Sequence, residues 1–410
     1  MVTGSETALA IQHPAKLRHG GDKAKLISSN DTSGFTFLGR FLSSNEAASV
    51  SFDVTQKAHN ALRWLIQRQA YRAGDQAIVS WAVSGQPIPD ALADTSWLFA
   101  AAGQTEEAQS PADTAQAFAL RLSRAIAGYG AKLDPTDEIV VMALDSATPG
   151  RMSITFYREI KGSEFLSRIE EWHQRYAWFQ NYGKDRKFIG AAAPRDIAEA
   201  AYGRRLDDKL RKSTVECLLP SIVDRLPIPR DLIFSAFRRA VNRVSLEPWD
   251  WEKCLGIVCG LFKGFHSERN YQMALEQDRV SRDYLFGRLL ALADNMENYA
   301  LRLAGENRDT TAARLMQRFA DRPASTWRTI EMGLRPYMSR LRSSAGGFLV
   351  NRERLLDEIV SSFQAADFTS DGKLSPEFLL GYHCQRQTWR SAQPQAGSPA
   401  AESTESSINE

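Results

Sequence analysis

Hydrophobic and polar positions predict a helix and three strands in the first 160 residues. Residues 53–70 place apolar side chains at helical spacing and leave Lys57, Arg63 and Arg68 outside, which predicts an amphipathic helix. The run AIVSWAV at 77–83 predicts a buried strand. DEIVVMALD and RMSITFYREI are β-branched runs on either side of residues 146–150, so they predict a β-hairpin. Together these segments predict a small mixed α/β region.

After Lys161 the pattern is helical throughout. The segment GSEFLSRIEEWHQRYAWF predicts an aromatic-rich amphipathic helix. Farther on, five apolar residues step by 4, 3, 4 and 7, as in the seam of a helical bundle: Leu285, Leu289, Leu292, Met296 and Leu303. We expect Asp309 to cap the next helix, Pro323 to begin another and Ser375 to cap the last. The predicted fold class is α+β, a small mixed α/β middle region with a β-hairpin followed by an all-α C-terminal helical bundle.

Turn signals and composition suggest five parts. Polar, Gly/Ser-rich stretches such as SSNDTSGF predict irregular structure near the N-terminus, and GQTEEAQSPADTAQ predicts a solvated linker. The Ser-, Ala-, Gln- and Glu-rich end predicts disorder. The expected parts are an irregular N-terminal segment at 1–50, a mixed α/β domain at 51–200, a helical connector at 201–272, the C-terminal bundle at 273–390 and a disordered tail at 391–410.

Composition narrows the class of protein. With 43% hydrophobic residues in 410, the chain can bury a large core. Its four cysteines lack paired C-x-x-C spacing, so we expect reduced core thiols. The longest apolar run, residues 254–262, is too short to span a bilayer, and no signal-peptide pattern is present. We therefore predict a cytoplasmic protein without membrane interactions.

Familiar catalytic and cofactor motifs are missing from the sequence. It contains no P-loop, no complete G-x-G-x-x-G and no G-x-S-x-G. DFTSDGKLSPEF begins like an EF-hand, but Phe378 occupies the position that needs a bidentate Glu, so a turn is the better interpretation. The histidines are scattered and the paired carboxylates lie on helices rich in counter-charges. We predict no catalytic residues, no metal and no cofactor.

Arginine is the unusual feature of the C-terminal part. Between residues 273 and 390 the basic residues are sixteen Arg and one Lys, and residues 313–345 hold seven Arg against Asp321 and Glu331. A guanidinium group holds phosphate or carboxylate through a planar fork. Like charges at i, i+4 repel unless an anion lies between them. We interpret the two predicted helices as a phosphate-binding surface with a Trp or Tyr available for base stacking, and a surface neutralised by its own salt bridges is the alternative.

The predicted nucleic-acid-binding residues follow from this charge pattern. The main set comprises Arg314, Arg318, Arg322, Arg328, Arg335, Arg340 and Arg342. A second basic site is expected at Arg204, Arg205, Lys209, Arg211 and Lys212.

Seven ordered segments resemble one known family. They are SVSFDVTQKAHNALRWLIQRQAYRAGDQAIVSWAVSG, VVMALDSATPGRMSITFYREI, DKLRKSTVECLLPSIVD, PRDL, RDYLFGRLLALAD, AARLMQRFADRPASTWRTIE and EFLLGYHCQRQ. The segments resemble, in this order, the large subunit of the type I-C CRISPR surveillance complex (Cascade), over about residues 2–390. The resemblance implies a non-catalytic subunit that works with CRISPR guide RNA and other Cascade subunits in antiviral defence. It also implies binding of target DNA, a bundle near the displaced strand, and cleavage by a recruited nuclease-helicase.

The resemblance carries two further expectations. Family members have a substantial region ahead of the segment matching VTGSETALAIQHP, and the contacts that read the flanking motif lie there, so we expect this chain to be a fragment, a product of a misassigned start or a split subunit. The bundle of this family can also be made separately from an internal start, for which Met273 is the candidate.

Two other functions remain open from the sequence. One is a metal-dependent nuclease that uses a cluster of carboxylates. The other is a purely structural scaffold subunit whose arginines pair with carboxylates of a neighbouring protein.

Overall fold

The chain folds into two compact units. The computed structural model describes residues 2–28, 41–42, 46, 48–104, 114–148, 150–183 and 186–391. Among these residues, unit 1 ends at residue 271 and unit 2 begins at residue 272. The predicted turn segment at 29–35, most of the predicted linker and all but the first residue of the predicted tail lie outside the described residues.

A four-stranded antiparallel sheet organises unit 1. Its order is β1-β2-β3-β4, with Val79 of β2 opposite Met142 of β3, and Met142 opposite Tyr157 of β4. The predicted strand and hairpin are confirmed, although the first hairpin strand continues to Thr148 instead of ending before Ser146. The strands are β1 (Tyr71–Ala73), β2 (Gln76–Ala82), β3 (Glu138–Thr148) and β4 (Arg151–Lys161).

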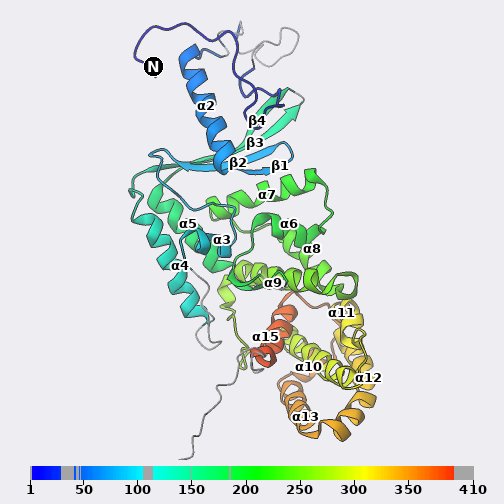
Figure 1. Ribbon diagram of the computed structural model, residues 1–410. Coiled ribbons are helices and arrows are strands. Elements are labelled where there is room, and N and C mark those ends of the chain that lie inside the picture. Colours follow the sequence, from blue (N-terminus) through cyan, green and yellow to red (C-terminus); the bar gives the residue numbers. More distant parts are fainter. Residues whose placement is uncertain are drawn as a thin grey trace, which may run out of the picture. The chain divides into compact units, whose positions relative to one another are not determined.

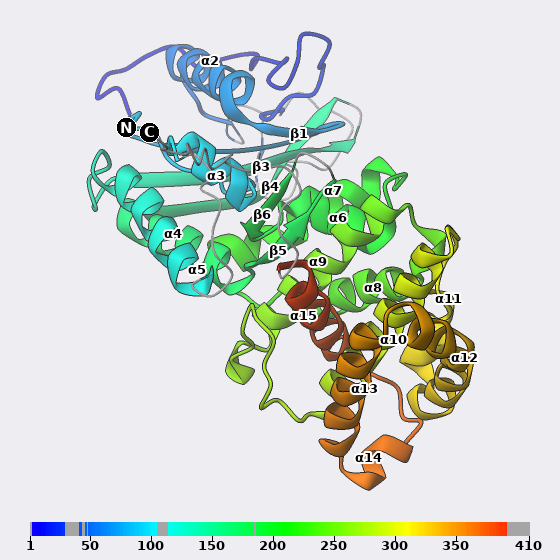
Figure 2. The same ribbon diagram turned by 60° about the horizontal axis from the view of Figure 1, so that its bottom comes forward.

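Helices cover both faces of this sheet (Figures 1 and 2). The predicted first helix, α2 (Phe52–Gln69), lies on one face, and its first turn is capped by Ser51, whose hydroxyl accepts a hydrogen bond from the Val54 backbone N–H at 3.2 Å. On the other face lie α5 (Gly162–Arg175) and α7 (Asp208–Val223). Because both faces are covered, β3 is buried on both sides, which explains its nearly continuous apolar sequence.

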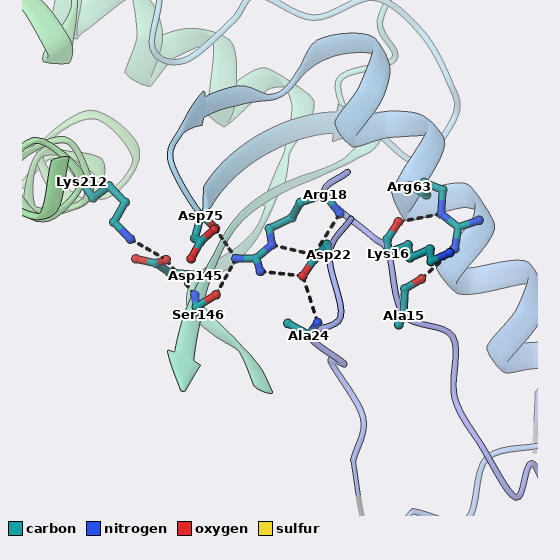
Figure 3. A network of polar contacts seen from close by, with 10 residues as sticks. All are labelled: Ala15, Lys16, Arg18, Asp22, Ala24, Arg63, Asp75, Asp145, Ser146 and Lys212. Atoms are coloured by element: carbon teal, nitrogen blue, oxygen red, sulfur yellow. Dashed lines mark hydrogen bonds and ion pairs between the residues drawn. The ribbon is translucent and has the colours of Figure 1, made fainter. Parts of the chain in front are cut away.

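Residues 2–28 have few regular elements but pack onto the sheet. Leu17 and Ala24 belong to the same buried cluster as Ile66 and Val79. Figure 3 shows the polar contacts that hold this segment, with Arg18 at their centre. Its Nε and Nη2 donate to the two carboxylate oxygens of Asp22 at 2.8 and 2.9 Å, and its Nη1 donates to the Ser146 hydroxyl at 2.9 Å. A buried, paired guanidinium therefore ties the N-terminal segment to β3.

The prediction of continuous helix after Lys161 is wrong. The helix ends at Arg175, and β5 (Trp178–Asn181) pairs with β6 (Lys187–Gly190) in a two-stranded antiparallel sheet. The glycines of α9 (Pro248–Phe265) allow this strand to approach closely, since a β carbon on Gly256 would lie 2.6 Å from the Phe179 carbonyl oxygen. Tertiary packing, which the local pattern does not report, therefore overrides helix propensity here.

The remaining helices of unit 1 pack mainly on one another and on α5, α7 and α9. A buried ion pair joins one of them, α6 (Pro194–Tyr202), to α9, because Lys253 Nζ of α9 lies 2.7 Å from Asp196 and 2.8 Å from Glu199 of α6. These helices are α3 (Thr95–Ala101), α4 (Thr114–Gly130), α6 (Pro194–Tyr202), α8 (Arg230–Val241) and the 3-10 turns η2 (Arg243–Ser245) and η3 (Ser267–Arg269).

Unit 2 is built around one central helix, α10 (Arg282–Leu303). Its predicted seam is buried except for Leu303, which is 48% exposed because the helix ends there. Gly287 of α10 and Gly381 face the partner helix so closely that a β carbon on either would lie within 2.2 Å of a carbonyl oxygen. The neighbours of α10 are α11 (Thr311–Asp321), α12 (Pro323–Ser344), α13 (Gly346–Ser361) and α15 (Glu377–Ser391), and the short α14 is Ala365–Thr369.

The predicted fold class is confirmed. The sheets lie in the N-terminal half of the chain and helices dominate the C-terminal half. The described residues of unit 2 contain helices and connecting loops without a β-strand.

Candidate nucleic-acid interface

Two buried carboxylates of α10 hold the first turn of α11. The Thr310 hydroxyl accepts a hydrogen bond from the Ala313 N–H at 3.0 Å and donates to Asp294 at 2.6 Å. The Thr311 N–H donates to Glu297 at 2.7 Å. Negative charge at a helix N-terminus is favourable, so these contacts fix where α11 begins. The cap is Thr310 rather than the predicted Asp309, because the threonine hydroxyl can satisfy the helix and the buried acid together.

The next helix, α12, begins at Pro323 as predicted. Its first turn is capped from outside by Asp371, whose carboxylate accepts a hydrogen bond from the Ser325 N–H at 2.9 Å. That hydrogen bond, with a smaller contribution from the nearby charge of Arg322, holds the pKa of Asp371 below its usual value. An acid of the EF-hand-like segment therefore caps a helix, and Phe378 of the same segment is fully buried.

Ser375 makes a different contact from the one predicted. Its hydroxyl donates a hydrogen bond to the Asp283 carboxylate at 2.7 Å, and α15 begins two residues later at Glu377. The serine therefore links the loop before α15 to the start of α10.

All seven arginines predicted on these helices are exposed. Met316 and Phe319 face the core from α11, and Ile330 and Leu334 face it from α12. The arginines at 328, 335 and 342 recur every seven residues, which is close to two helical turns, so they form a line along α12 with steps of about 10.5 Å. The buried faces therefore leave the guanidinium groups directed to solvent.

The arginines differ in whether an acid is already bound. Arg340 lies 3.0 Å from Glu306, and Arg342 lies 3.1 Å from Glu353. Hydrogen bonds from Arg308 and Arg340 lower the pKa of Glu306. No carboxylate oxygen in the described part of the chain lies within 4.0 Å of the other five guanidinium groups, those of Arg314, Arg318, Arg322, Arg328 and Arg335.

The aromatic side chains of α12 are poorly placed for stacking. Trp327 is only 2% exposed, so the structure contradicts the use of this ring for base stacking. Tyr337 is half-buried, and its hydroxyl accepts a hydrogen bond from Arg308 at 2.6 Å. The surface formed by α11 and α12 therefore offers charge, with little flat aromatic area.

In the second predicted basic site, which lies in unit 1, three of the five residues already contact other side chains. Arg204 lies over the Trp249 ring at 4.6 Å from its centre, and Arg211 pairs with Asp208 at 3.0 Å. Lys212 pairs with Asp145 at 2.9 Å, as Figure 3 shows. Arg205 and Lys209 are exposed, and neither has a carboxylate within 4.0 Å among the residues that the structure describes.

A groove beside Lys212 has a mixed lining. It has a volume of about 1060 Å³ and lies against α7 and the β3–β4 hairpin. Four carboxylates and two lysines line it: Asp75, Asp145, Asp208, Glu216, Lys209 and Lys212. A phosphate entering this groove would meet more negative than positive charge, so the groove itself does not fit a polyanion.

Comparison with known proteins identifies the family. Residues 1–390 match the family described as CRISPR-associated protein (Cas_Csd1). The chain belongs to the Cas_Csd1 family. No curated protein matches the sequence. Membership supports a CRISPR-associated large subunit of the Csd1 type that works with other Cas proteins.

The four cysteines of this Csd1-family chain differ in exposure. Cys254, Cys259 and Cys384 are buried thiols as expected, whereas Cys217 is exposed. Burial lowers the pKa of His173 to about 4, and Thr95 shares a hydrogen bond with its ring at 2.8 Å.

The described residues contain no group of three His, Cys, Asp or Glu side chains arranged to hold a metal ion. None of the described helices is both long and apolar enough to cross a bilayer.

Proposed function

We propose that this protein is a non-catalytic large subunit of a type I-C CRISPR surveillance complex. In this proposal it assembles in the cytoplasm with guide RNA and other Cascade subunits and binds target DNA. The helices α11 and α12 contact phosphates of the displaced strand, and Arg205 and Lys209 form a smaller site in unit 1. A recruited nuclease-helicase performs the cleavage.

The observation that carries the proposal is the set of five exposed arginines that have no carboxylate within 4.0 Å in the described part of the chain. A surface neutralised by its own side chains would pair most of these guanidinium groups, as happens at Arg340 and Arg342. Arginine binds phosphate through charge-assisted hydrogen bonds from a planar fork. The Cas_Csd1 membership supports a partner that is a nucleic acid.

The test measures binding of the assembled complex to single-stranded DNA between 50 and 200 mM salt. Each phosphate contact to a single strand contributes about 0.7 to the slope of log affinity against log salt. Arg314→Ala with Arg318→Ala should therefore make the slope shallower by about 1.4. Over this fourfold rise in salt, the variant complex should lose about sevenfold less affinity than the unmodified complex. Sequence preference should not change.

A control of equal charge is available in the same helices. Arg340→Ala with Arg342→Ala also removes two positive charges, but these side chains already pair with Glu306 and Glu353, so the slope should change less. If the Arg314 and Arg318 variant keeps both the affinity and the salt slope of the unmodified complex, the proposal for this surface is wrong.

The two alternatives predict different results. A structural scaffold would lose assembly with a neighbouring subunit when these arginines are replaced, without any effect on DNA binding by the complexes that do form. A metal-dependent nuclease would cleave single- or double-stranded DNA on addition of Mg²⁺ or Mn²⁺ in the absence of any other nuclease.

A further inference from the structure

The loop that joins β2 to α3 separates two small pockets of unit 1. It covers residues 83–94, and Asp90 lines both pockets. One has a volume of about 250 Å³ and the other about 320 Å³. These volumes are at the lower limit of ordinary ligand sites, so each pocket suits a single flat group better than a large cofactor.

The first pocket combines indole rings with a guanidinium group. Trp64 of α2 is 55% exposed, and the Arg68 guanidinium lies over it, 4.8 Å from the ring centre. Trp81 of β2 forms another wall, and Pro87 and Pro89 of the loop complete the lining. The exposed Trp64 ring and the Arg68 guanidinium group together give this pocket an aromatic surface and a positive charge.

The second pocket repeats this combination with different residues. Trp97 of α3 is 62% exposed, and Tyr71 and Tyr129 line the same pocket. Arg195, at the start of α6, is exposed at its rim, and no carboxylate of the described residues lies within 4.0 Å of it. The other acid in the lining, Asp94, already pairs with Arg186 and accepts a hydrogen bond from the backbone N–H of Trp97. The pocket therefore offers three flat rings and a cation that has no carboxylate partner among the described residues.

Asp90, which the pockets share, supplies a polar group between them. Its carboxylate accepts a hydrogen bond from the Leu92 N–H at 2.9 Å. Desolvation raises the pKa of Asp90, although part of the residue remains exposed. A carboxyl group in this position can hydrogen-bond to the amino or imino edge of a heterocycle that lies between the rings.

Flat rings, nearby arginines and a hydrogen-bonding group at the edge are the features that proteins use to hold unstacked bases. Bases stack on Trp and Tyr faces or on guanidinium planes, and every base has such a face. Neither Arg68 nor Arg195 has a carboxylate within 4.0 Å among the described residues. A peptide ligand would gain little from these two arginines unless it were acidic, whereas a nucleotide provides both a ring and a phosphate.

We propose that the two pockets bind two neighbouring, unstacked bases of a single-stranded nucleic acid. Trp64 and Trp97 provide the stacking faces, and Arg68 and Arg195 face the sugar-phosphate backbone. This site lies wholly within unit 1 and does not depend on the arginines of α11 and α12.

The experiment compares base-carrying and abasic strands. The full-length protein is titrated with a 12-nucleotide strand and with a strand of equal length that has two adjacent abasic positions, in RNA and DNA versions. Stacking should make the base-carrying strand bind roughly tenfold or more tightly in at least one of the two versions. Trp64→Ala with Trp97→Ala should abolish this difference without changing the salt slope, because no charge is removed.

Two controls separate this site from the proposed DNA surface. Phe52→Ala removes an exposed ring of α2 that lines neither pocket, so it should keep the preference for bases. Arg314→Ala with Arg318→Ala should lower the salt slope while the preference for bases remains. Failure of one proposal is therefore distinguishable from failure of the other.

Two results would overturn the inference. One is equal binding of base-carrying and abasic strands in both RNA and DNA. The other is retention of the preference for bases by the double tryptophan variant, and loss of assembly with other Cas subunits in that case would show a protein interface instead. If the variant does not fold, the unmodified protein is photocrosslinked to strands that contain 5-iodouracil. Adducts at Trp64, Trp97 or Tyr129 would support the site, and adducts only at other residues would refute it.

Discussion

The crossing of α10 and α15 gives a quantitative prediction about the stability of unit 2. At Gly287 an added β carbon would lie 1.9 Å from the Phe378 carbonyl oxygen and 2.7 Å from the Tyr382 nitrogen. Both neighbours are backbone atoms of a helix, so neither can turn aside as a side chain would. Gly287→Ala therefore has to push the two helices apart.

The expected cost is the difference between two terms. Overpacking a core position costs roughly 1–3 kcal/mol, and a contact this short against backbone belongs at the upper end of that range. The better helix propensity of alanine returns up to about 1 kcal/mol. The net loss is about 2 kcal/mol, which for a unit of this size lowers the melting temperature by about 8 °C.

A second glycine provides the matched control. At Gly333 of α12 the nearest atom to an added β carbon is Thr311 Cγ2 at 3.9 Å, an ordinary van der Waals distance. Gly333→Ala should therefore stabilise unit 2 by up to about 1 kcal/mol, through helix propensity alone. The same chemical change is expected to have opposite signs at the two positions.

Thermal melting with hydrogen exchange measured by mass spectrometry tests this pair. Exchange should become faster in peptides of α10 and α15 for Gly287→Ala, and slower or unchanged for Gly333→Ala. If Gly287→Ala melts at the temperature of the unmodified protein, or if both variants shift in the same direction, the close backbone contact does not exist in solution.

Three further predictions concern other parts of the chain. Because burial lowers the pKa of His173 to about 4, the unfolded chain binds a proton there that the folded chain does not, so unit 1 should lose up to about 3 kcal/mol of stability as pH falls from about 6.5 to about 4. Urea denaturation at pH 7 and pH 4.5 measures this loss, and His173→Gln should reduce it; an equal loss in the variant would contradict the assignment. A maleimide reagent should modify one thiol, Cys217, in the native protein and four after denaturation, and rapid native labelling of a second thiol would show that the buried cysteines are accessible. A C-terminally tagged gene in its native operon should yield a second product that begins at Met273, which Met273→Leu removes, and an immunoblot without that band would refute the internal start.

Local patterns in the sequence predicted the elements whose stability is largely local. The amphipathic pattern of α2, the apolar runs of β2 and the β3–β4 hairpin, and the proline at the start of α12 each identify an element without reference to the rest of the chain. The exposed faces of α11 and α12 also follow from helical spacing. The sequence therefore predicted where these arginines would point, although whether they bind nucleic acid stays a prediction.

Contacts between distant residues explain what local reasoning missed. The strand β5 exists beside the glycines of α9, about eighty positions away, and Lys212 binds Asp145 across a comparable interval. The seam pattern could not show that α10 would end at Leu303, or that Trp327 would turn inward. The pair formed by Arg18 and Asp22 gave no signal, because an i, i+4 spacing is informative only within a helix.

The anchoring of α11 and α12 also has a consequence for the kind of polymer that could lie along them. Asp294 and Glu297 hold the start of one helix and Asp371 holds the start of the other, and regular helix geometry sets the spacing of the arginine Cα atoms along each helix before any ligand arrives. A duplex is stiff over about 150 base pairs and brings phosphates at intervals of its own. A flexible single strand can instead bend until its phosphates meet the arginines that project from α12 at backbone intervals of about 10.5 Å.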